Sequence, residues 1–355
     1  MFRTLQVRGS QASLFLLLLA SLGIHASAQT PTKVDPDGTA HITRTVPIPK
    51  TLSQEARDYL KKPPPAFRAE SWSLERVRTA FAVEYNELTE ELKKSYPVTV
   101  EQKTVAGVKT SFIHPVNPPS KKKNRIIINF HGGGFVVGQG DIVEAVPIAS
   151  LTQTTVVAVD YRLGPEHPYP AALDDAVAVY KSLLKTYKAS NIGVYGCSAG
   201  AILTAQMTAR LRQLGLPLPG AIGIFSGTGD VQEGGDSLAI NSLTGFWGAV
   251  SPPSNEPGLN PYYGSRDPKD PVISPLYGKL QGFPPALFVT SSRDLLFSPT
   301  VVLHKAFVRA GVDAQLIVFD GLPHTFWTIV LLPESREAYS IMSDFFDNKL
   351  GRTRK

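Results

Sequence analysis

A chain of 355 residues with 43% hydrophobic and 19% charged residues can bury a large core in one or two domains, which excludes an intrinsically disordered protein. Its formal net charge of +6 is too small to indicate nucleic-acid binding. Cys197 is the sole cysteine, so an internal disulfide is excluded as well.

The beginning of the chain has the features of an export signal. Arg3 and Arg8 give a basic start, residues 14–24 are apolar, and Ala26-Ser27-Ala28 provides the small residues typical of a cleavage site. The apolar stretch is shorter than the ~20 residues that span a bilayer, which favours a cleaved leader over a membrane anchor. We therefore expect residues 1–28 to be removed and the mature chain to be periplasmic or secreted, beginning at Gln29.

Two helical segments precede the first expected strand. Residues 52–61 and 73–94 read as helices, and the second has apolar residues at three- and four-residue spacing. Three consecutive prolines at positions 63–65 separate the two segments. We assign residues 29–95 to an N-terminal extension that includes these helices, and residues 96–350 to the main domain.

From about Val98 the pattern changes to short β-rich runs separated by helical periods. The runs are apolar on both faces, which is typical of buried parallel strands, and the alternation predicts an α/β fold with a mostly parallel central sheet flanked by helices. Residues 234–271 interrupt the alternation with many Gly, Pro, Ser and Asn residues and several aromatic ones, so we interpret them as a lid-like insert. The expected strands include residues 126–128, 156–159, 192–195, 222–225, 287–289 and 316–318.

A glycine-flanked serine follows one of these strands. The sequence GCSAG at residues 196–200 lies between the strand at 192–195 and a helical stretch. A sharp strand-to-helix turn strains its central residue and brings the residues two before and two after it together, so both must be very small. Gly196 and Gly200 meet this requirement for Ser198, which predicts Ser198 as a nucleophile.

Cys197 is a weaker candidate for the nucleophile. The residues two positions away would then be Tyr195 and Ala199, and the tyrosine side chain would collide with the turn. We expect Cys197 to be a buried or half-buried small residue.

A second glycine-rich turn, HGGGF at residues 131–135, directly follows a predicted strand. Acyl transfer requires N–H donors aimed at the oxygen that becomes negative, and glycines let the backbone come close to it. We expect the amides of Gly133, Gly134 and Ala199 to form this oxyanion hole, with Gly132 mainly shaping the turn.

A nucleophilic serine needs a base, and two histidines follow Ser198 in the sequence. His304 lies inside a helix predicted at residues 299–310, where a structural role is expected. His324 follows a predicted strand in a loop at its C-terminal end, which is where open α/β sheets place their sites. We therefore predict His324 as the base.

The base in turn needs an orienting carboxylate. Asp294 comes just after the strand at 286–290, again at a C-terminal end, whereas the competing Asp320 is only four residues before His324. We predict Asp294 as the acid. His131 comes too early for the chain order serine, acid, histidine, so we interpret it as holding the glycine loop by hydrogen bonds.

With these residues assembled, the sequence resembles the hormone-sensitive-lipase-like group of α/β hydrolases, which includes many bacterial esterases. The resemblance covers roughly residues 70–345 and implies the α/β-hydrolase fold, the same three catalytic residues, and an N-terminal helical cap over the acyl site. The motifs that carry it occur in the family's order: HGGGF at 131–135, DYRLGPEHPYP at 160–170, GCSAG at 196–200, Asp294 with Leu296, and GLPHTF at 321–326.

The resemblance carries one further expectation and two departures. In the family the DYRLGPEHPYP segment is a structural bend, which implies an internal ion pair between Arg162 and Glu166. The family's turn usually has Asp where this chain has Cys197 and Gly where it has Ala201. Neither change removes one of the three predicted catalytic residues.

We expect a serine hydrolase that cleaves small-molecule carboxylic esters with short to medium acyl chains, through an acyl-enzyme on Ser198 and without a metal or organic cofactor. Phe81 and Tyr85 of the cap helices suggest a moderately sized apolar pocket, although they are equally consistent with simple packing. A lactone hydrolase, an amidase or a deacetylase would use the same triad. A non-catalytic binding protein on this fold is a further alternative, against which the presence of His324 argues.

Overall fold

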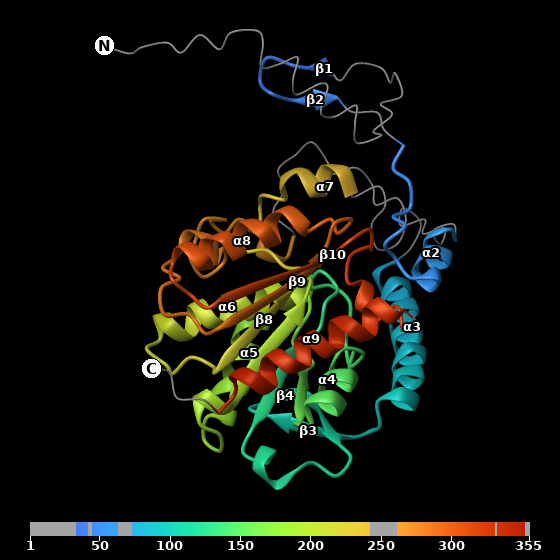
Figure 1. The fold of residues 1–355 in the computed structure, drawn as a ribbon. Coiled ribbons are helices and arrows are strands. Elements are labelled where there is room, and N and C mark those ends of the chain that lie inside the picture. Colours follow the sequence, from blue (N-terminus) through green and yellow to red (C-terminus); the bar gives the residue numbers. More distant parts are fainter. Residues whose placement is uncertain (1–32, 42–44, 63–72, 242–260, 331, 352–355) are drawn as a thin grey trace. The chain divides into compact units, whose positions relative to one another are not determined.

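The computed structural model forms two compact units, residues 1–48 and 49–355. In the first unit, β1 (Lys33–Val34) and β2 (Ala40–His41) pair antiparallel. The predicted leader lies outside the described residues, and the predicted boundary between residues 95 and 96 stays a prediction. The described residues are 33–41, 45–62, 73–241, 261–330 and 332–351 (Figure 1).

The second unit is built on one eight-stranded sheet with the strand order β10-β9-β8-β7-β5-β6-β4-β3. Strands β5 to β10 are parallel to one another and cover the six predicted runs, which confirms the predicted α/β fold. The hairpin of β3 and β4 adds an antiparallel edge next to β6. The strands are β3 (Val98–Val105), β4 (Val108–Pro115), β5 (Ile126–Phe130), β6 (Val156–Val159), β7 (Ile192–Cys197), β8 (Ala221–Phe225), β9 (Ala286–Ser291) and β10 (Ala314–Phe319).

Helices cover both faces of the sheet. Helices α5, α6 and α8 share one continuous apolar core with it, while α4 and α9 pack against each other on the other face, toward the viewer in Figure 1. The helices predicted at 52–61 and 73–94 are present as α2 and α3. The described helices are α2 (Gln54–Leu60), α3 (Leu74–Ser95), α4 (Ala145–Thr152), α5 (Ala171–Leu183), α6 (Ala199–Gln213), α7 (Gly235–Asn241), α8 (Phe297–Arg309) and α9 (Pro333–Lys349).

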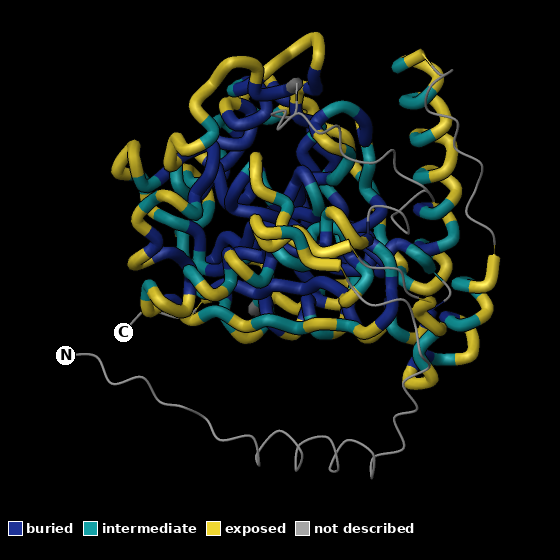
Figure 2. Tube along the Cα trace, turned by 90° about the horizontal axis from the view of Figure 1, so that it is seen from above, coloured by how far each residue is buried: buried dark blue, intermediate teal, exposed yellow. Residues whose placement is uncertain are grey.

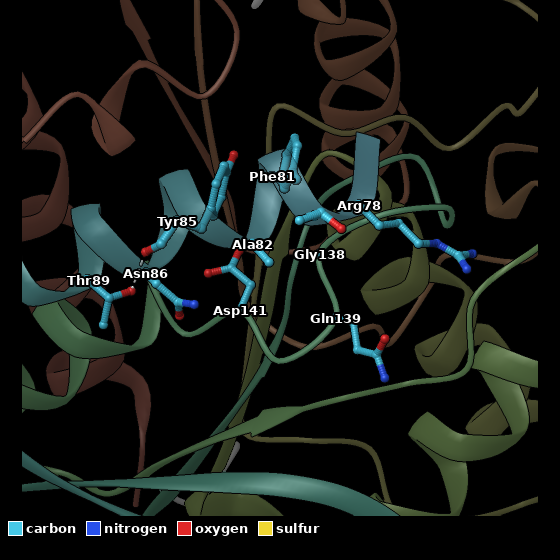
Figure 3. A pocket seen from close by; sticks show the side chains of 10 residues that line it. Arg78, Phe81, Ala82, Tyr85, Asn86, Thr89, Gly138, Gln139 and Asp141 are labelled. Carbon is cyan, nitrogen blue, oxygen red and sulfur yellow. Dashed lines mark hydrogen bonds between the residues drawn. The ribbon is translucent and has the colours of Figure 1, made fainter. Parts of the chain in front are cut away.

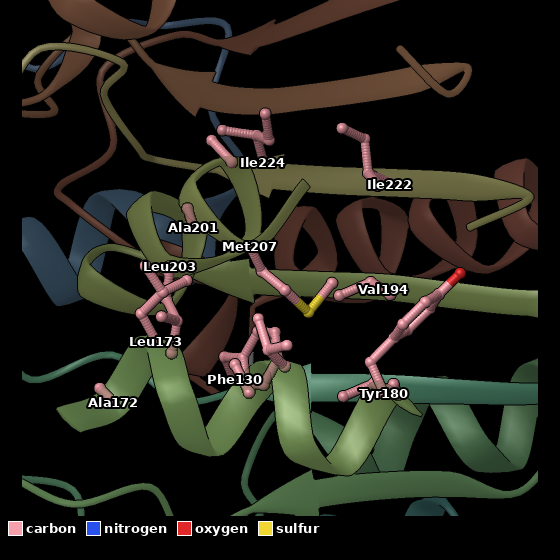
Figure 4. Close-up of a cluster of buried hydrophobic side chains, with 14 of the residues drawn as sticks. Phe130, Ala172, Leu173, Tyr180, Val194, Ala201, Leu203, Met207, Ile222 and Ile224 are labelled. Carbon is pink, nitrogen blue, oxygen red and sulfur yellow. The ribbon is translucent and has the colours of Figure 1, made fainter. Parts of the chain in front are cut away.

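The core beneath the site is formed where α6 lies on β5, β7 and β8. Figure 4 shows Leu203 and Met207 of α6 among side chains of these strands and of α5, and both residues are completely buried. Burial of each such side chain contributes about 1.5–3 kcal/mol. This packing holds the first turn of α6, and with it the preceding residue Ser198, at a fixed position above the sheet.

Helix α3 lies at the side of the second unit and is far less buried than the sheet (Figure 2). The side-chain oxygen of Ser73 accepts a hydrogen bond from Arg76 N and so caps its first turn. Within α3, Thr89 and Leu92 are the buried residues. Among the described residues, no helix combines the length and the apolar character needed to cross a membrane.

The predicted insert at 234–271 is described only at its two ends. It begins with α7, residues 242–260 lie outside the described residues, and Tyr262 and Tyr263 follow. Both tyrosines are buried, and the ring of Tyr262 stacks on Phe135 with centroids 4.4 Å apart. The end of the insert therefore belongs to the core.

The predicted ion pair between Arg162 and Glu166 is wrong. Arg162 instead forms a bidentate pair with Asp175 of α5, at N–O distances from 2.8 to 3.0 Å. Glu166 binds Arg78 of α3 through both carboxylate oxygens, at 2.7 and 2.8 Å. Two different helices therefore hold this bend. Helix α5 provides the carboxylate that binds Arg162, and α3 provides the guanidinium that binds Glu166.

Candidate active site

Ser198 occupies the turn between β7 and α6 in a strained conformation. Its φ of 52° and ψ of −121° lie in a region that residues with a side chain rarely adopt. Its amide donates to Phe225 O at 3.0 Å, and its carbonyl accepts from the amides of Ala201 and Ile202. These bonds fix the backbone, so the side chain is presented at the C-terminal end of a parallel strand.

The two glycines around Ser198 are required by close backbone contacts. A Cβ at Gly196 would lie 2.3 Å from the carbonyl carbon of Gly200, and a Cβ at Gly200 would lie 1.9 Å from Phe130 O. Real Cβ atoms do not approach other atoms this closely. The structure therefore agrees with the reason given for small residues at both positions.

The HGGGF loop passes beside this turn. A Cβ at Gly132 would lie 3.0 Å from Cys197 Sγ and 3.3 Å from Ser198 Cβ. Gly133 has a φ of +104°, and a Cβ there would lie 2.3 Å from Val137 O, so glycine is required there on both counts. Gly134 also has positive φ, at 62°. Ala199 is the first residue of α6, so its amide is one of the donors that a helix leaves unused at its N-terminus.

His131 supports the glycine loop from below. Its Nδ1 donates to Gly132 O at 2.7 Å, and its ring stacks on Tyr161 with centroids 4.1 Å apart. Tyr161 also donates its hydroxyl to His131 O at 2.7 Å. Burial lowers the pKa of His131 to about 4, so the ring is neutral at pH 7. This arrangement confirms the predicted loop-holding role.

Asp294 and His324 meet at the same edge of the sheet. Asp294 follows β9, His324 follows β10, and His324 Nδ1 donates to Asp294 Oδ1 at 2.6 Å. The carboxylate also accepts from Thr290 Oγ1 and from the amide of Leu296, both at 2.8 Å. Complete burial alone would raise the pKa of Asp294, but His324, together with the Ser226 hydroxyl and the hydrogen bond from the Leu296 amide, holds it below its usual value. The Asp294 carboxylate is therefore ionised at pH 7 and accepts hydrogen bonds from His324, Thr290 and Leu296.

The competing candidates lie elsewhere. His304 sits on α8 with its Nε2 3.3 Å from Ala314 O, in keeping with a structural role. Asp320 accepts hydrogen bonds from the hydroxyls of Ser292 and Thr51. Sequence order and strand ends had favoured Asp294 over Asp320, and the Asp294–His324 bond agrees with that choice.

Cys197 is buried, as expected. Burial, together with the neighbouring carboxyl of Glu144, raises the pKa of its thiol well above the ordinary value, so the thiol is neutral at pH 7. The other departure in the turn, Ala201, faces Gly227, where a Cβ would lie 2.5 Å from Ala201 Cβ. A glycine at 227 thus makes room for the methyl group of Ala201.

A pocket of about 430 Å³ opens above Ser198. Its size falls in the range of small-ligand sites. The start of the predicted insert contributes to it, in accordance with the interpretation of that segment as a binding loop. Besides Ser198, Gly134 and Ala199, the pocket is lined by Phe135, Ile202, Thr228, Asp230, Val231, Gln232, Glu233, Gly234, Leu238, Tyr263 and Leu296.

Phe81 and Tyr85 line a different pocket, of about 280 Å³, between α3 and the residues that follow the glycine loop (Figure 3). The two rings stack with centroids 4.3 Å apart. Helix α3 is tied to the glycine loop by Arg78, whose Nε donates to Val136 O at 2.8 Å. Sequence reasoning missed Arg78, because nothing in its local spacing marks it.

Comparisons with known proteins lead to the same class of protein. Residues 127–328 match the family model of the alpha/beta hydrolase fold. An acetyl-hydrolase of Streptomyces hygroscopicus is 29% identical over 240 residues, which cover 66% of this chain and 79% of the relative. An esterase of Acinetobacter venetianus is 30% identical over 226 residues, which cover 62% and 74%.

Solved structures agree with these relatives. One esterase structure superposes with a TM-score of 0.77 at 32% identity, covering 88% of this chain and 99% of the other. An esterase of the bacterial hormone-sensitive lipase family gives a TM-score of 0.69 at 29% identity, covering 83% and 96%. The chain belongs to the hormone-sensitive-lipase-like group of the α/β hydrolases. It is a carboxylesterase-type hydrolase, and its substrates are small-molecule carboxylic esters.

Proposed function

We propose that the protein hydrolyses esters of short- to medium-chain acids through a catalytic triad of Ser198, His324 and Asp294. The observation that carries the proposal is the buried 2.6 Å hydrogen bond from His324 Nδ1 to Asp294 Oδ1, at the sheet edge where Ser198 also lies. By accepting the Nδ1 proton, Asp294 fixes the ring tautomer in which Nε2 is the nitrogen that can take a proton from Ser198.

The reaction proceeds in two steps. His324 Nε2 takes the proton of Ser198 Oγ as the oxygen attacks the ester carbonyl, and the amides of Gly133, Gly134 and Ala199 stabilise the resulting oxyanion. His324 then returns the proton to the departing alcohol, which leaves the acyl group on Ser198. In the second step His324 activates a water molecule, which attacks the acyl-enzyme and releases the acid.

The pocket above Ser198 supports a limited acyl length. Its larger aliphatic and phenylalanine side chains offer an apolar surface for an acyl chain of modest size: Phe135, Ile202, Val231, Leu238 and Leu296. Each buried methylene contributes about 0.8 kcal/mol, equivalent to about a fourfold gain in kcat/KM, until the pocket is full.

We therefore expect kcat/KM for p-nitrophenyl esters to rise from acetate to an optimum at butyrate or hexanoate and to be at least about 100-fold below that optimum for palmitate. Leu238→Trp fills part of the pocket and should move the optimum to acetate. Val308→Trp, at an exposed position of α8, is the matched control and should leave the profile unchanged. A profile that rises steadily to palmitate would contradict the proposed acyl range.

We also propose that the protein is exported and that residues 1–28 form the cleaved leader, on the basis of their basic, apolar and small-residue regions. Expression of the full chain in a Gram-negative host should give a periplasmic product whose intact mass corresponds to a start at Gln29. Replacing Ala26 and Ala28 by Arg should block cleavage and leave the leader attached. A cytoplasmic product that retains residues 1–28 in the unaltered chain would refute the proposed leader.

A further inference from the structure

Glu144, just before α4, has a buried carboxyl group that the proposed chemistry does not use. The side chain is 4% exposed, and its Oε1 accepts a hydrogen bond from Trp327 Nε1 at 2.7 Å. Its backbone carbonyl accepts from the hydroxyl of Tyr195 at 3.1 Å. A carboxyl group is costly to bury unless it is bonded, so the indole hydrogen bond to Oε1 offsets part of the cost of burying this one.

The indole that Glu144 binds belongs to the loop that carries His324. Trp327 lies three residues after His324, in the 3-10 turn Phe326–Thr328, and is completely buried. Its ring packs edge-on against Phe225, with centroids 6.1 Å apart. Phe225 O is also the acceptor for the amide of Ser198. The indole therefore joins the loop of His324 to the β8 residue whose carbonyl binds the Ser198 amide.

The other contacts of Glu144 lead to the nucleophile turn. Tyr195 lies on β7, three residues before Ser198. The thiol of Cys197 lies close enough to the Glu144 carboxyl for each to change the pKa of the other. Glu144 is thus linked both to residues beside Ser198, through Tyr195 and Cys197, and to the loop of His324, through Trp327.

We propose that Glu144 is a positioning residue, which fixes the His324 loop relative to the Ser198 turn by accepting the hydrogen bond of the Trp327 indole. The proposal rests on the proposed function, because it assumes that Ser198 and His324 react together. A misplacement of reacting groups by about 1 Å can cost about 100-fold in rate, so a single fixed hydrogen bond in this position is enough to matter. Substrate binding depends on the pocket residues above Ser198, so its strength should change little.

The test compares kcat of variants per active site, with sites counted by phosphonate labelling of Ser198 run to completion. Glu144→Met removes the acceptor at similar side-chain length, and Trp327→Phe removes the donor. Each should lower kcat at least about tenfold while KM stays within about twofold. Glu144→Gln retains an oxygen that can accept from the indole and should recover most of kcat. The double variant Glu144→Met, Trp327→Phe should be no slower than the slower single variant, because both remove the same bond.

Tyr180→Phe is the matched control. It removes a hydrogen bond of similar length from a buried ring, from Tyr180 Oη to Pro217 O at 2.8 Å, in a part of the core away from the site. It should lower the unfolding temperature without changing kcat per site. The same measurement on Glu144→Met and Trp327→Phe separates lost positioning from lost stability.

Two results would be decisive against the proposal. If Glu144→Met and Trp327→Phe keep the kcat of the unaltered enzyme per active site, however much their unfolding temperatures fall, Glu144 has a purely structural role and the proposal alone fails. If the unaltered protein hydrolyses no ester, or Ser198→Ala hydrolyses as fast, the proposed function fails and the positioning role fails with it.

Discussion

Ser198→Ala should lower kcat/KM for p-nitrophenyl butyrate by on the order of 10⁶-fold. The substitution removes the attacking oxygen, and the oxyanion donors and the pocket then leave a residual acceleration of about 10³- to 10⁴-fold over water. Alanine is smaller than serine and keeps the same backbone hydrogen bonds, so the turn with its φ of 52° should be preserved. The measurement is initial rates at saturating and limiting ester, on protein whose unfolding temperature matches that of the unaltered chain.

Ser343→Ala provides the matched control, because Ser343 is a buried serine of α9 outside the site. It should retain full activity. A Ser198→Ala protein that keeps more than about a tenth of the activity would exclude the serine mechanism, because removing a nucleophile lowers the rate far more than about tenfold.

Gly200→Ala should abolish activity and lower the free energy of unfolding by more than about 4 kcal/mol, an exceptional effect for one substitution. The added Cβ would lie 1.9 Å from Phe130 O and 2.6 Å from His131 O. Both obstacles are backbone atoms, Phe130 O at the end of the central strand β5 and His131 O in the glycine loop. Moving the first would disturb the pairing of β5 with β7, and moving the second would disturb its hydrogen bond from Tyr161. Urea denaturation monitored by tryptophan fluorescence, together with ester hydrolysis, measures the two losses.

Gly278→Ala serves as the comparison. Gly278 has a φ of −94°, and a Cβ there would have its nearest atoms at 3.3 Å, so only a small change in stability is expected. If Gly200→Ala were as stable and active as Gly278→Ala, the turn around Ser198 would have room for a Cβ at position 200. That result would contradict the close approach of Gly200 to Phe130 O.

The parts of the site that the sequence predicts are those governed by local geometry. A tight turn around Ser198 needs Gly196 and Gly200, and the close contacts that a Cβ would make at either position agree with this. Asp294 and His324 were chosen because each follows a predicted strand, and parallel strands bring their C-terminal ends to one edge.

The interactions that could not be predicted join residues far apart in the chain. Glu166 pairs with Arg78, 88 positions away, and Trp327 binds Glu144, 183 positions away. No spacing rule connects such residues, because their proximity depends on how α3 and α4 pack after the sheet has formed. The resemblance implied Arg162, in the same motif, as the partner of Glu166, whereas in the structure Glu166 binds Arg78.

The tie between Arg78 and the glycine loop has a consequence for exchanging parts between related enzymes. Arg78 donates to Val136 O and to Gly164 O and also binds Glu166, so one guanidinium group of α3 holds two separate loops of the catalytic fold. Grafting a foreign N-terminal segment onto this scaffold would therefore remove a support of the HGGGF turn, whose amides we propose as the oxyanion donors. A chimera that transfers Arg78 together with residues 131–138 and Glu166 would preserve the contacts that hold the two loops in place.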